Sequence, residues 1–310
     1  MHRHRIKKTT KEKKHSRIRT AIQLGFAVFL NGYAAGFAGG KIFTGKTKLL
    51  CVPVLNCYSC PGALGACPIG ALQSVLGGTK NKFPFYVLGT LMVFGVLFGR
   101  LLCGFVCPFG FLQDLISKIP VKKINVPKKL DKALRIIKYG ILLVFVILLP
   151  LLATDKFGIG TPYFCKYICP AGTLEGGIPL MIANRDLRAL AGALFNWKLA
   201  VLMVVMIGCL FIRRFFCRYL CPLGAFYALF NKFSLYQLHL DKDKCISCKK
   251  CEHVCPMAVE VTKNINSGEC IRCGKCKAAC PTSAISSRYL TLMQNDSVMK
   301  SAETPPTENG

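Results

Sequence analysis

The chain has 310 residues, of which 52% are hydrophobic, and it carries 42 Lys and Arg residues against 14 Asp and Glu, a formal net charge of +28. A mean hydropathy of +0.41 is high for a soluble domain and favours a membrane protein with polar ends. The basic residues lie in short runs beside apolar segments, a pattern that orients a chain against an anionic leaflet, so nucleic acid is not expected as a partner.

The amino-terminal end is strongly basic. Residues 1–20 contain nine Lys and Arg, and residues 1–17 are expected to form a disordered tail in the cytoplasm. The first membrane span is predicted at residues 18–40. A cleavable signal peptide is the competing interpretation, but the apolar stretch is long for one, which favours an uncleaved anchor. Gln23 and Asn31 lie inside this stretch and should face protein rather than lipid.

Three further spans are predicted, at residues 84–102, 136–153 and 197–212. Pro150 should kink the third, and Trp197 should anchor the fourth at the membrane interface. An even number of spans places both termini on one side of the bilayer. The loop 104–135 carries seven Lys and Arg, which favours the cytoplasm for that side. The chain is therefore predicted to be a multi-pass protein of the cytoplasmic membrane.

The membrane region, residues 18–235, contains an internal repeat. The sequence FGRLLCGFVCPFG at 98–110 matches IRRFFCRYLCPLG at 212–224, and CPIGALQ at 67–73 matches CPAGTLE at 169–175. Each half reads as a span, an outer cysteine loop, a second span and an inner cysteine loop. The predicted membrane domain is therefore a mainly α, four-span helical bundle built from two repeated halves that run in the same sense.

The chain has nineteen cysteines. A disulfide scaffold belongs to short secreted chains, whereas CxxC and CxxxCP groups beside membrane spans are typical of metal ligation.

Residues 236–290 contain two consecutive runs of the form CxxCxxCxxxCP. This is the spacing of a bacterial ferredoxin with two [4Fe–4S] clusters, in which three cysteines wrap a loop around one cube and the fourth reaches the other. A zinc ribbon is the alternative, but it would use paired CxxC knuckles rather than this duplicated order. The domain should be small and α+β, and residues 291–310 are expected to be disordered. The predicted ligand sets are Cys245, Cys248, Cys251 and Cys280 for one cluster, and Cys270, Cys273, Cys276 and Cys255 for the other.

Two cysteine pairs in the membrane region are spaced four residues apart, Cys103 with Cys107 and Cys217 with Cys221. On a helix end this spacing places both thiolates on one face. Both pairs fall at the inner ends of spans, so together they supply the four thiolates that one more cubane needs. Ordinary buried cysteines are the alternative interpretation.

The outer loops carry a less regular set. Cys165 and Cys169 form another pair, and Cys67 aligns with Cys169. The alignment leaves one position without a cysteine, so Cys60 or Cys57 must replace it, and the proline after Cys60 favours that residue. A second membrane cluster is therefore predicted, with an outer disulfide or a larger site as alternatives. Its predicted ligands are Cys60, Cys67, Cys165 and Cys169.

Other cofactor sites are not indicated. None of the histidines lies in a predicted span, so a bis-histidine haem inside the bundle is excluded. The chain has no Rossmann glycine fingerprint and no P-loop. Cys51 and Cys209 fit no ligand set, and Cys209 is expected to be an ordinary buried residue.

The predicted spans, the paired motifs at 103–108 and 217–222 and the two ferredoxin runs resemble the NapH/NosR-type membrane iron–sulfur proteins over residues 18–286. The resemblance implies a cytoplasmic-membrane electron-transfer subunit that oxidises quinol or relays electrons to a partner reductase. This chain departs from the family by its outer motifs and by showing no counterpart of the large extracytoplasmic flavin-binding portion of NosR. These departures favour a cluster wire across the bilayer over the quinol role.

The expected function is electron relay between a cytoplasmic donor, such as a soluble ferredoxin or flavodoxin, and a membrane or extracytoplasmic acceptor. The basic inner loops favour an acidic donor. One alternative is a quinol dehydrogenase with a pocket near Asn31, Gln73 or Gln113, side chains that helix packing also explains. The other alternative is a redox-sensing regulator or maturation factor. No catalytic residue is assigned.

Overall fold

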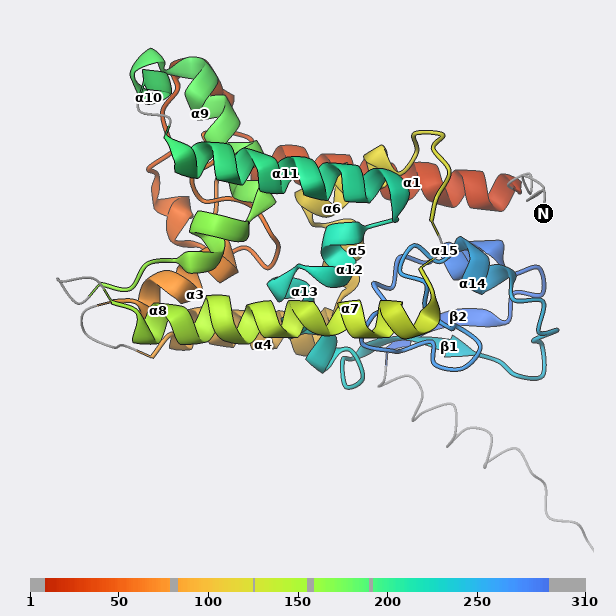
Figure 1. Ribbon diagram of the computed structural model, residues 1–310. Helices are drawn as coiled ribbons and strands as arrows, with labels where there is room; N and C mark the ends of the chain where they lie inside the picture. Colours follow the sequence, from red (N-terminus) through yellow and green to blue (C-terminus); the bar gives the residue numbers. More distant parts are fainter. Residues whose placement is uncertain (1–8, 79–82, 125, 155–158, 190–191, 290–310) are drawn as a thin grey trace, which may run out of the picture.

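The computed structural model describes residues 9–78, 83–124, 126–154, 159–189 and 192–289. Helices dominate these residues, and a two-stranded sheet lies at one end of the molecule (Figure 1). The predicted mainly α fold with a small α+β domain is confirmed at this level. The tail predicted at 291–310 and the first eight residues of the chain lie outside the described residues.

The amino-terminal helix α1 (Thr10–Leu30) begins inside the segment that was expected to be disordered, so that expectation is wrong for residues 10–17. Thr9 explains the difference, because its side chain accepts a hydrogen bond from the Glu12 backbone while the Glu12 carboxylate accepts one from the Thr9 backbone. This capping box satisfies N–H groups that a helix start otherwise leaves unpaired.

The predicted span at 18–40 is interrupted after α1, and the chain continues into the short helix α2 (Ala34–Gly39). At the break, the Leu30 carbonyl accepts a hydrogen bond from the Leu64 backbone, and the Gly62 carbonyl accepts one from Tyr33, at 3.0 and 3.2 Å. The loop that contains Gly62 and Leu64 thus supplies the partners that helix continuation would have supplied.

The second predicted span, 84–102, is divided as well. Helix α4 (Phe85–Phe98) is 14 residues long and ends at Gly99, whose φ of +55° is readily adopted only by glycine. A β-carbon at Gly99 would lie 2.6 Å from Asn231 Oδ1, so a larger residue would also clash. Helices α5 (Leu101–Phe105) and α6 (Pro108–Ile116) follow.

Two helices in the described part of the chain are long and apolar enough to cross a membrane. One is continuous over 25 residues, Lys128–Leu152, and consists of α7 (Lys128–Ile141), the π-helical segment η2 (Leu142–Leu148) and α8 (Leu149–Leu152). The other is α11 (Ala193–Phe211). The π-helical turns directly precede Pro150, where the ring removes a hydrogen-bond donor and crowds the preceding turn. These turns lie next to the proline at which a kink was predicted, and the kink itself stays a prediction.

Short helices fill the space between these two long ones (Figure 1). Three of them, α3 (Pro68–Leu76), α6 and α13 (Pro222–Phe230), start with a proline directly after a cysteine. Proline suits this first position because its missing N–H would have no partner there. Other short helices outside the carboxy-terminal domain are η1 (Lys46–Leu49), η3 (Phe164–Ile168), η4 (Gly172–Gly177), α9 (Ile178–Ala183), α10 (Arg185–Ala189) and α12 (Phe215–Tyr219).

The carboxy-terminal domain is closed by an antiparallel pair of strands, β1 (Tyr236–Leu240) and β2 (Ile285–Tyr289). Tyr236 pairs with Tyr289, and their rings pack edge to face 5.5 Å apart. Between the strands lie α14 (Lys250–Val254) and α15 (Lys275–Ala279), one in each cysteine run. The first and last segments of the domain therefore pair with each other, and both cysteine runs lie between them in the sequence.

Candidate metal centres

One cavity is lined by four cysteines of the carboxy-terminal domain, and Cys276 is one of them. Burial raises the pKa of Cys276 above its usual range, and the nearby thiols of the set raise it further. Four thiolates held this close repel one another unless cations bind between them, so the donor set fits an iron–sulfur cluster. The cysteines that line the cavity are Cys255, Cys270, Cys273 and Cys276, one predicted ligand set.

The other predicted ferredoxin set contains Cys245, Cys248, Cys251 and Cys280. Its loop has the same backbone shape as its counterpart, because residues with positive φ recur at equivalent positions in the two runs. Such left-handed residues between cysteines turn successive backbone N–H groups inward, which forms a concave surface suited to an anionic cluster. The equivalent pairs are Ser247 with Arg272, Lys249 with Gly274, and Ala258 with Ser283.

In the described part of the chain, no three side chains of His, Cys, Asp or Glu converge closely enough to hold one metal ion. A four-iron cube is larger than an ion, and its cysteine ligands stand correspondingly farther apart. A [4Fe–4S] cluster held by these cysteines would accept and donate one electron at a time.

The four cysteines predicted to lie at the inner ends of the spans are all buried, with 5–7% of each residue exposed. They are Cys103, Cys107, Cys217 and Cys221. Two arginines cross between their motifs. Arg214 donates to the Cys103 carbonyl at 2.7 Å, and Arg100 donates to the Cys217 carbonyl at 3.0 Å. Each arginine lies three residues before the first cysteine of its own motif and bonds the first cysteine of the other. The two motifs, which are over 100 residues apart in sequence, are therefore held face to face.

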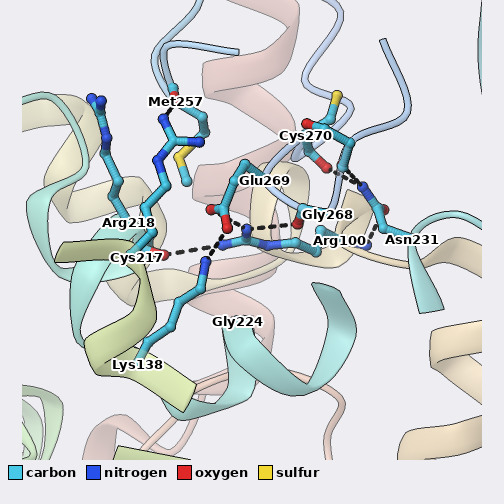
Figure 2. Close-up of polar contacts among 12 residues, drawn as sticks. Arg100, Lys138, Cys217, Arg218, Gly224, Asn231, Met257, Gly268, Glu269 and Cys270 are labelled. Atoms are coloured by element: carbon cyan, nitrogen blue, oxygen red, sulfur yellow. Dashed lines mark hydrogen bonds and ion pairs between the residues drawn. The ribbon is translucent and has the colours of Figure 1, made fainter. Parts of the chain in front are cut away.

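Both crossing arginines are fully buried and paired with carboxylates. Arg214 contacts Asp114 of α6, which also pairs with Arg19 of α1. Arg100 contacts Glu269 of the ferredoxin domain at 2.9 Å, and Glu269 also pairs with Lys138 of α7 (Figure 2). Burial alone would raise the pKa of Glu269, but the charges of Arg100 and Lys138 outweigh it and hold this pKa below its usual value. The carboxylate is therefore ionised at neutral pH and joins the two domains.

The ferredoxin domain is packed directly on the inner motif. A β-carbon added at Gly104, next to Cys103, would lie 2.5 Å from the Ile271 carbonyl oxygen and 3.7 Å from Cys273 Cα. Asn231 supports the same loop by donating to the Cys270 carbonyl at 2.9 Å (Figure 2). One predicted ferredoxin ligand therefore lies against the backbone next to an inner membrane ligand.

The outer cysteines Cys67, Cys165 and Cys169 are brought together from two loops. Gln73 donates to Cys165 Sγ at 3.3 Å. Burial raises the pKa of Cys169 well above its usual value, and the neighbouring Cys165, Cys57 and Cys67 thiols raise it further. Cys60 is buried, and its Sγ donates to Asn31 Oδ1 at 3.5 Å.

The polar side chains that were considered for a quinol pocket make contacts within the protein. Gln113 donates to Cys217 Sγ at 3.0 Å and Gln73 bonds Cys165, so both glutamines touch predicted ligands. Gln23 is 2% exposed and donates to the Gly104 carbonyl at 3.0 Å, which confirms that it faces protein. Cys209 is fully buried, as expected.

Sequence reasoning missed the crossing arginines and their carboxylate partners. Their signal was present, because Arg100 and Arg214 occupy the same position of the repeat. Asp114 and Glu269 carry no repeat signal, and only packing identifies them.

Two families of iron–sulfur proteins match parts of the chain. The family described as a 4Fe–4S binding domain matches residues 83–127, 139–178 and 197–240. The family described as a 4Fe–4S dicluster domain matches residues 237–281. No solved structure matches the chain.

Several curated relatives are similar to the chain. An uncharacterized protein of Methanocaldococcus jannaschii is 31% identical over 58% of this chain and 68% of its own length. The putative electron transport protein YccM of Escherichia coli is 29% identical over 58% of this chain and 47% of its own. The regulatory protein NosR of Stutzerimonas stutzeri is 28% identical over 55% of this chain and 22% of its own.

The chain spans less than two thirds of the length of most of the curated relatives it matches. The family matches contain the pairs Cys103/Cys107, Cys165/Cys169 and Cys217/Cys221 and both ferredoxin runs, whereas residues 51–67 lie outside them. The chain belongs to the NapH/NosR-type family of 4Fe–4S binding proteins.

Proposed function

We propose that this protein carries electrons across the cytoplasmic membrane through four [4Fe–4S] clusters. In this proposal α1, α4, the helix Lys128–Leu152 and α11 are the four spans of two repeated halves. The amino-terminal end and the ferredoxin domain lie in the cytoplasm. The basic inner segments support this orientation, because Lys and Arg concentrate on the cytoplasmic side of membrane proteins.

The observation that carries the proposal is the contact between the ferredoxin loop and the inner motif. Cys273 and Ile271 pack against Gly104, next to Cys103, with no room for even one added carbon. A cluster held by Cys273 and one held by Cys103 would then be neighbours, separated only by this backbone contact. The ferredoxin domain would thus be the entry to the membrane path rather than a separate appendage.

The proposed route has one electron entering from a soluble ferredoxin or flavodoxin and passing through the two ferredoxin clusters. The electron then passes to the inner cluster, held by Cys103, Cys107, Cys217 and Cys221, and from there to the outer cluster. The outer cluster transfers it to a membrane or extracytoplasmic acceptor. Each cluster is reduced by one electron and reoxidised when it passes that electron on, so no atoms are exchanged. The name of YccM, a putative electron transport protein, is consistent with this class of role.

Metal analysis tests the number of clusters. Anaerobically purified protein is expected to contain about sixteen irons and as many acid-labile sulfides per chain, four for each cubane. EPR of the reduced protein should resolve membrane clusters in addition to the ferredoxin pair. A value near eight irons would refute both membrane clusters, and a value near twelve would refute one of them.

Gly104→Ala tests the contact itself. The added methyl group meets a backbone carbonyl that is held in place, so the ferredoxin loop must shift away from the inner motif. We expect unchanged iron content but electron transfer from the ferredoxin clusters to the inner cluster that is slower by roughly ten- to a hundredfold. Rapid-freeze EPR after reduction of the ferredoxin clusters measures this rate.

Gly89→Ala is the matched control, because a β-carbon at Gly89 of α4 meets nothing within 4 Å. It should transfer electrons at the rate of the unmodified protein. Equal rates in the Gly104 and Gly89 variants would mean that electrons do not pass through this contact.

A further inference from the structure

The outer cysteine set has three clear members, Cys67, Cys165 and Cys169, and two candidates for the fourth. The proline after Cys60 favoured that residue on sequence grounds. We propose instead that Cys57 is the fourth ligand of the outer cluster. This inference rests on the outer cluster of the proposed function, and it concerns which thiolates hold it.

The first support is a hydrogen-bonding rule that two of the other three Cys-Pro motifs follow. Gln113 lies six residues after Cys107, and it bonds Cys217 twice, donating to Sγ at 3.0 Å and accepting from the backbone N–H at 3.4 Å. Gln73 lies six residues after Cys67, and it donates to Cys165 Sγ at 3.3 Å. In both cases the sixth residue after a CP cysteine reaches the first cysteine of the facing motif.

The same position in the remaining outer motif is Glu175, six residues after Cys169. Its carboxylate accepts a hydrogen bond from the Cys57 backbone N–H at 2.8 Å. Cys57 therefore stands opposite the Cys169 motif as Cys165 stands opposite the Cys67 motif. In the fourth motif the equivalent residue, Tyr227, departs from the rule and donates instead to the Pro53 carbonyl at 2.9 Å, four residues before Cys57.

The sulfur positions agree with this rule. A β-carbon added at Gly172 would lie 3.7 Å from Cys57 Sγ and 3.9 Å from Cys169 Sγ. At Gly70, the equivalent position after Cys67, the added carbon would lie 3.8 Å from Cys165 Sγ. In each outer motif the third residue after the CP cysteine is thus a glycine that the facing sulfur approaches. The Cys60 sulfur instead contacts Asn31.

A buried amide next to Cys57 provides independent support. Asn56 is fully buried, and neither atom of its side-chain amide has a hydrogen-bond partner among the described residues. A buried amide without a partner is unfavourable, because it has lost its hydrogen bonds to water and gained none in the protein. The sulfide or thiolate of a cluster held by Cys57 would accept a hydrogen bond from this amide, as cluster sulfurs commonly do.

The segment before Cys57 contacts the inner site, so Cys57 lies close in sequence to an inner ligand's neighbour. The Leu55 carbonyl oxygen lies 3.9 Å from Cys107 Sγ, an inner ligand. Cys57 follows Leu55 by two residues. A cluster that includes Cys57 would therefore be joined to the inner site by a short stretch of backbone.

Variants of the whole chain in which one cysteine at a time is replaced distinguish Cys57 from Cys60. On binding iron the Cys57 thiol loses its proton and forms one Fe–S bond, so Cys57→Ala should lose about four of about sixteen irons. It should also lose one cluster signal in EPR and keep the ferredoxin signals. Cys60→Ala, the matched control, should keep all of them. Cys57→Ser, with a weaker oxygen ligand of similar size, should retain iron but shift the potential and g values of one cluster.

The outcomes divide cleanly. Loss of iron from Cys60→Ala, alone or together with loss from Cys57→Ala, would overturn the assignment of Cys57 over Cys60. So would unchanged signals in both Cys57 variants. If Cys57→Ala loses the ferredoxin signals as well, the Cys57→Ser spectrum decides, and an unshifted spectrum overturns the assignment. About sixteen irons in the unmodified protein would leave the relay intact in each of these cases, whereas about eight would refute the relay itself.

Discussion

Replacing Cys103 and Cys107 together by alanine is expected to remove about four irons and four labile sulfides from the protein. The two sulfurs are half of the inner set, and a cubane cannot be held by two ligands. The two ferredoxin signals should remain, because their cysteines belong to a separate domain. Electrons placed on the ferredoxin clusters should no longer reach an outer acceptor, since the proposed route passes through this site. Iron analysis, EPR and vesicle-based electron transfer measure the three effects.

Cys209→Ala is the control for this experiment. Cys209 is fully buried and its Sγ lies 3.6 Å from Gln113 Oε1, so it is close to the inner set without belonging to it. Its loss should leave iron content and electron transfer unchanged. If the Cys103/Cys107 double variant retained every cluster signal, these two cysteines would not be ligands.

Asp114→Ala is expected to cause the largest loss of stability among single substitutions at the inner site. Asp114 is the shared partner of Arg214 and Arg19, and all three side chains are at most 10% exposed. Its removal leaves two guanidinium groups buried without a counter-charge, which destabilises a protein by about 3–5 kcal/mol. The thermal unfolding midpoint of the cluster-loaded protein in detergent, followed by visible absorbance, should fall by several degrees.

Asp186→Ala provides the comparison, because Asp186 is exposed on α10. A surface change of this kind typically alters stability by less than about 0.5 kcal/mol. Equal unfolding midpoints for the two variants would mean that the Arg214 and Arg19 charges are compensated by other groups.

The spans illustrate what hydropathy predicts well and where it fails. The third and fourth predicted spans correspond to the helices Lys128–Leu152 and Ala193–Phe211, because long apolar runs without glycine turns form continuous helices. Neither of the first two predicted spans is continuous, because one breaks at Asn31 and the other at Gly99. In both places another segment contacts the break, Leu64 in the first and Asn231 in the second. Hydropathy contains no information about such partners, so boundaries of this kind cannot be predicted from one sequence.

The sequence by itself was enough to predict the kind of cofactor and the two ferredoxin ligand sets. Cysteine spacing is a local property, and three thiols two residues apart define one loop around one cube wherever the loop lies. The repeat also placed Cys103 with Cys107 and Cys217 with Cys221 in equivalent positions, because duplicated segments keep their local structure.

Only the tertiary structure decided how these local units face one another. The crossing of Arg100 and Arg214 between motifs, the packing of Ile271 and Cys273 on Gly104, and the bond from Cys57 to Glu175 each join residues over 100 positions apart. Such contacts depend on the position and direction of several helices at once, which a spacing pattern does not encode. For this reason the sequence offered a choice between Cys60 and Cys57, and the packing of the outer loops favours Cys57.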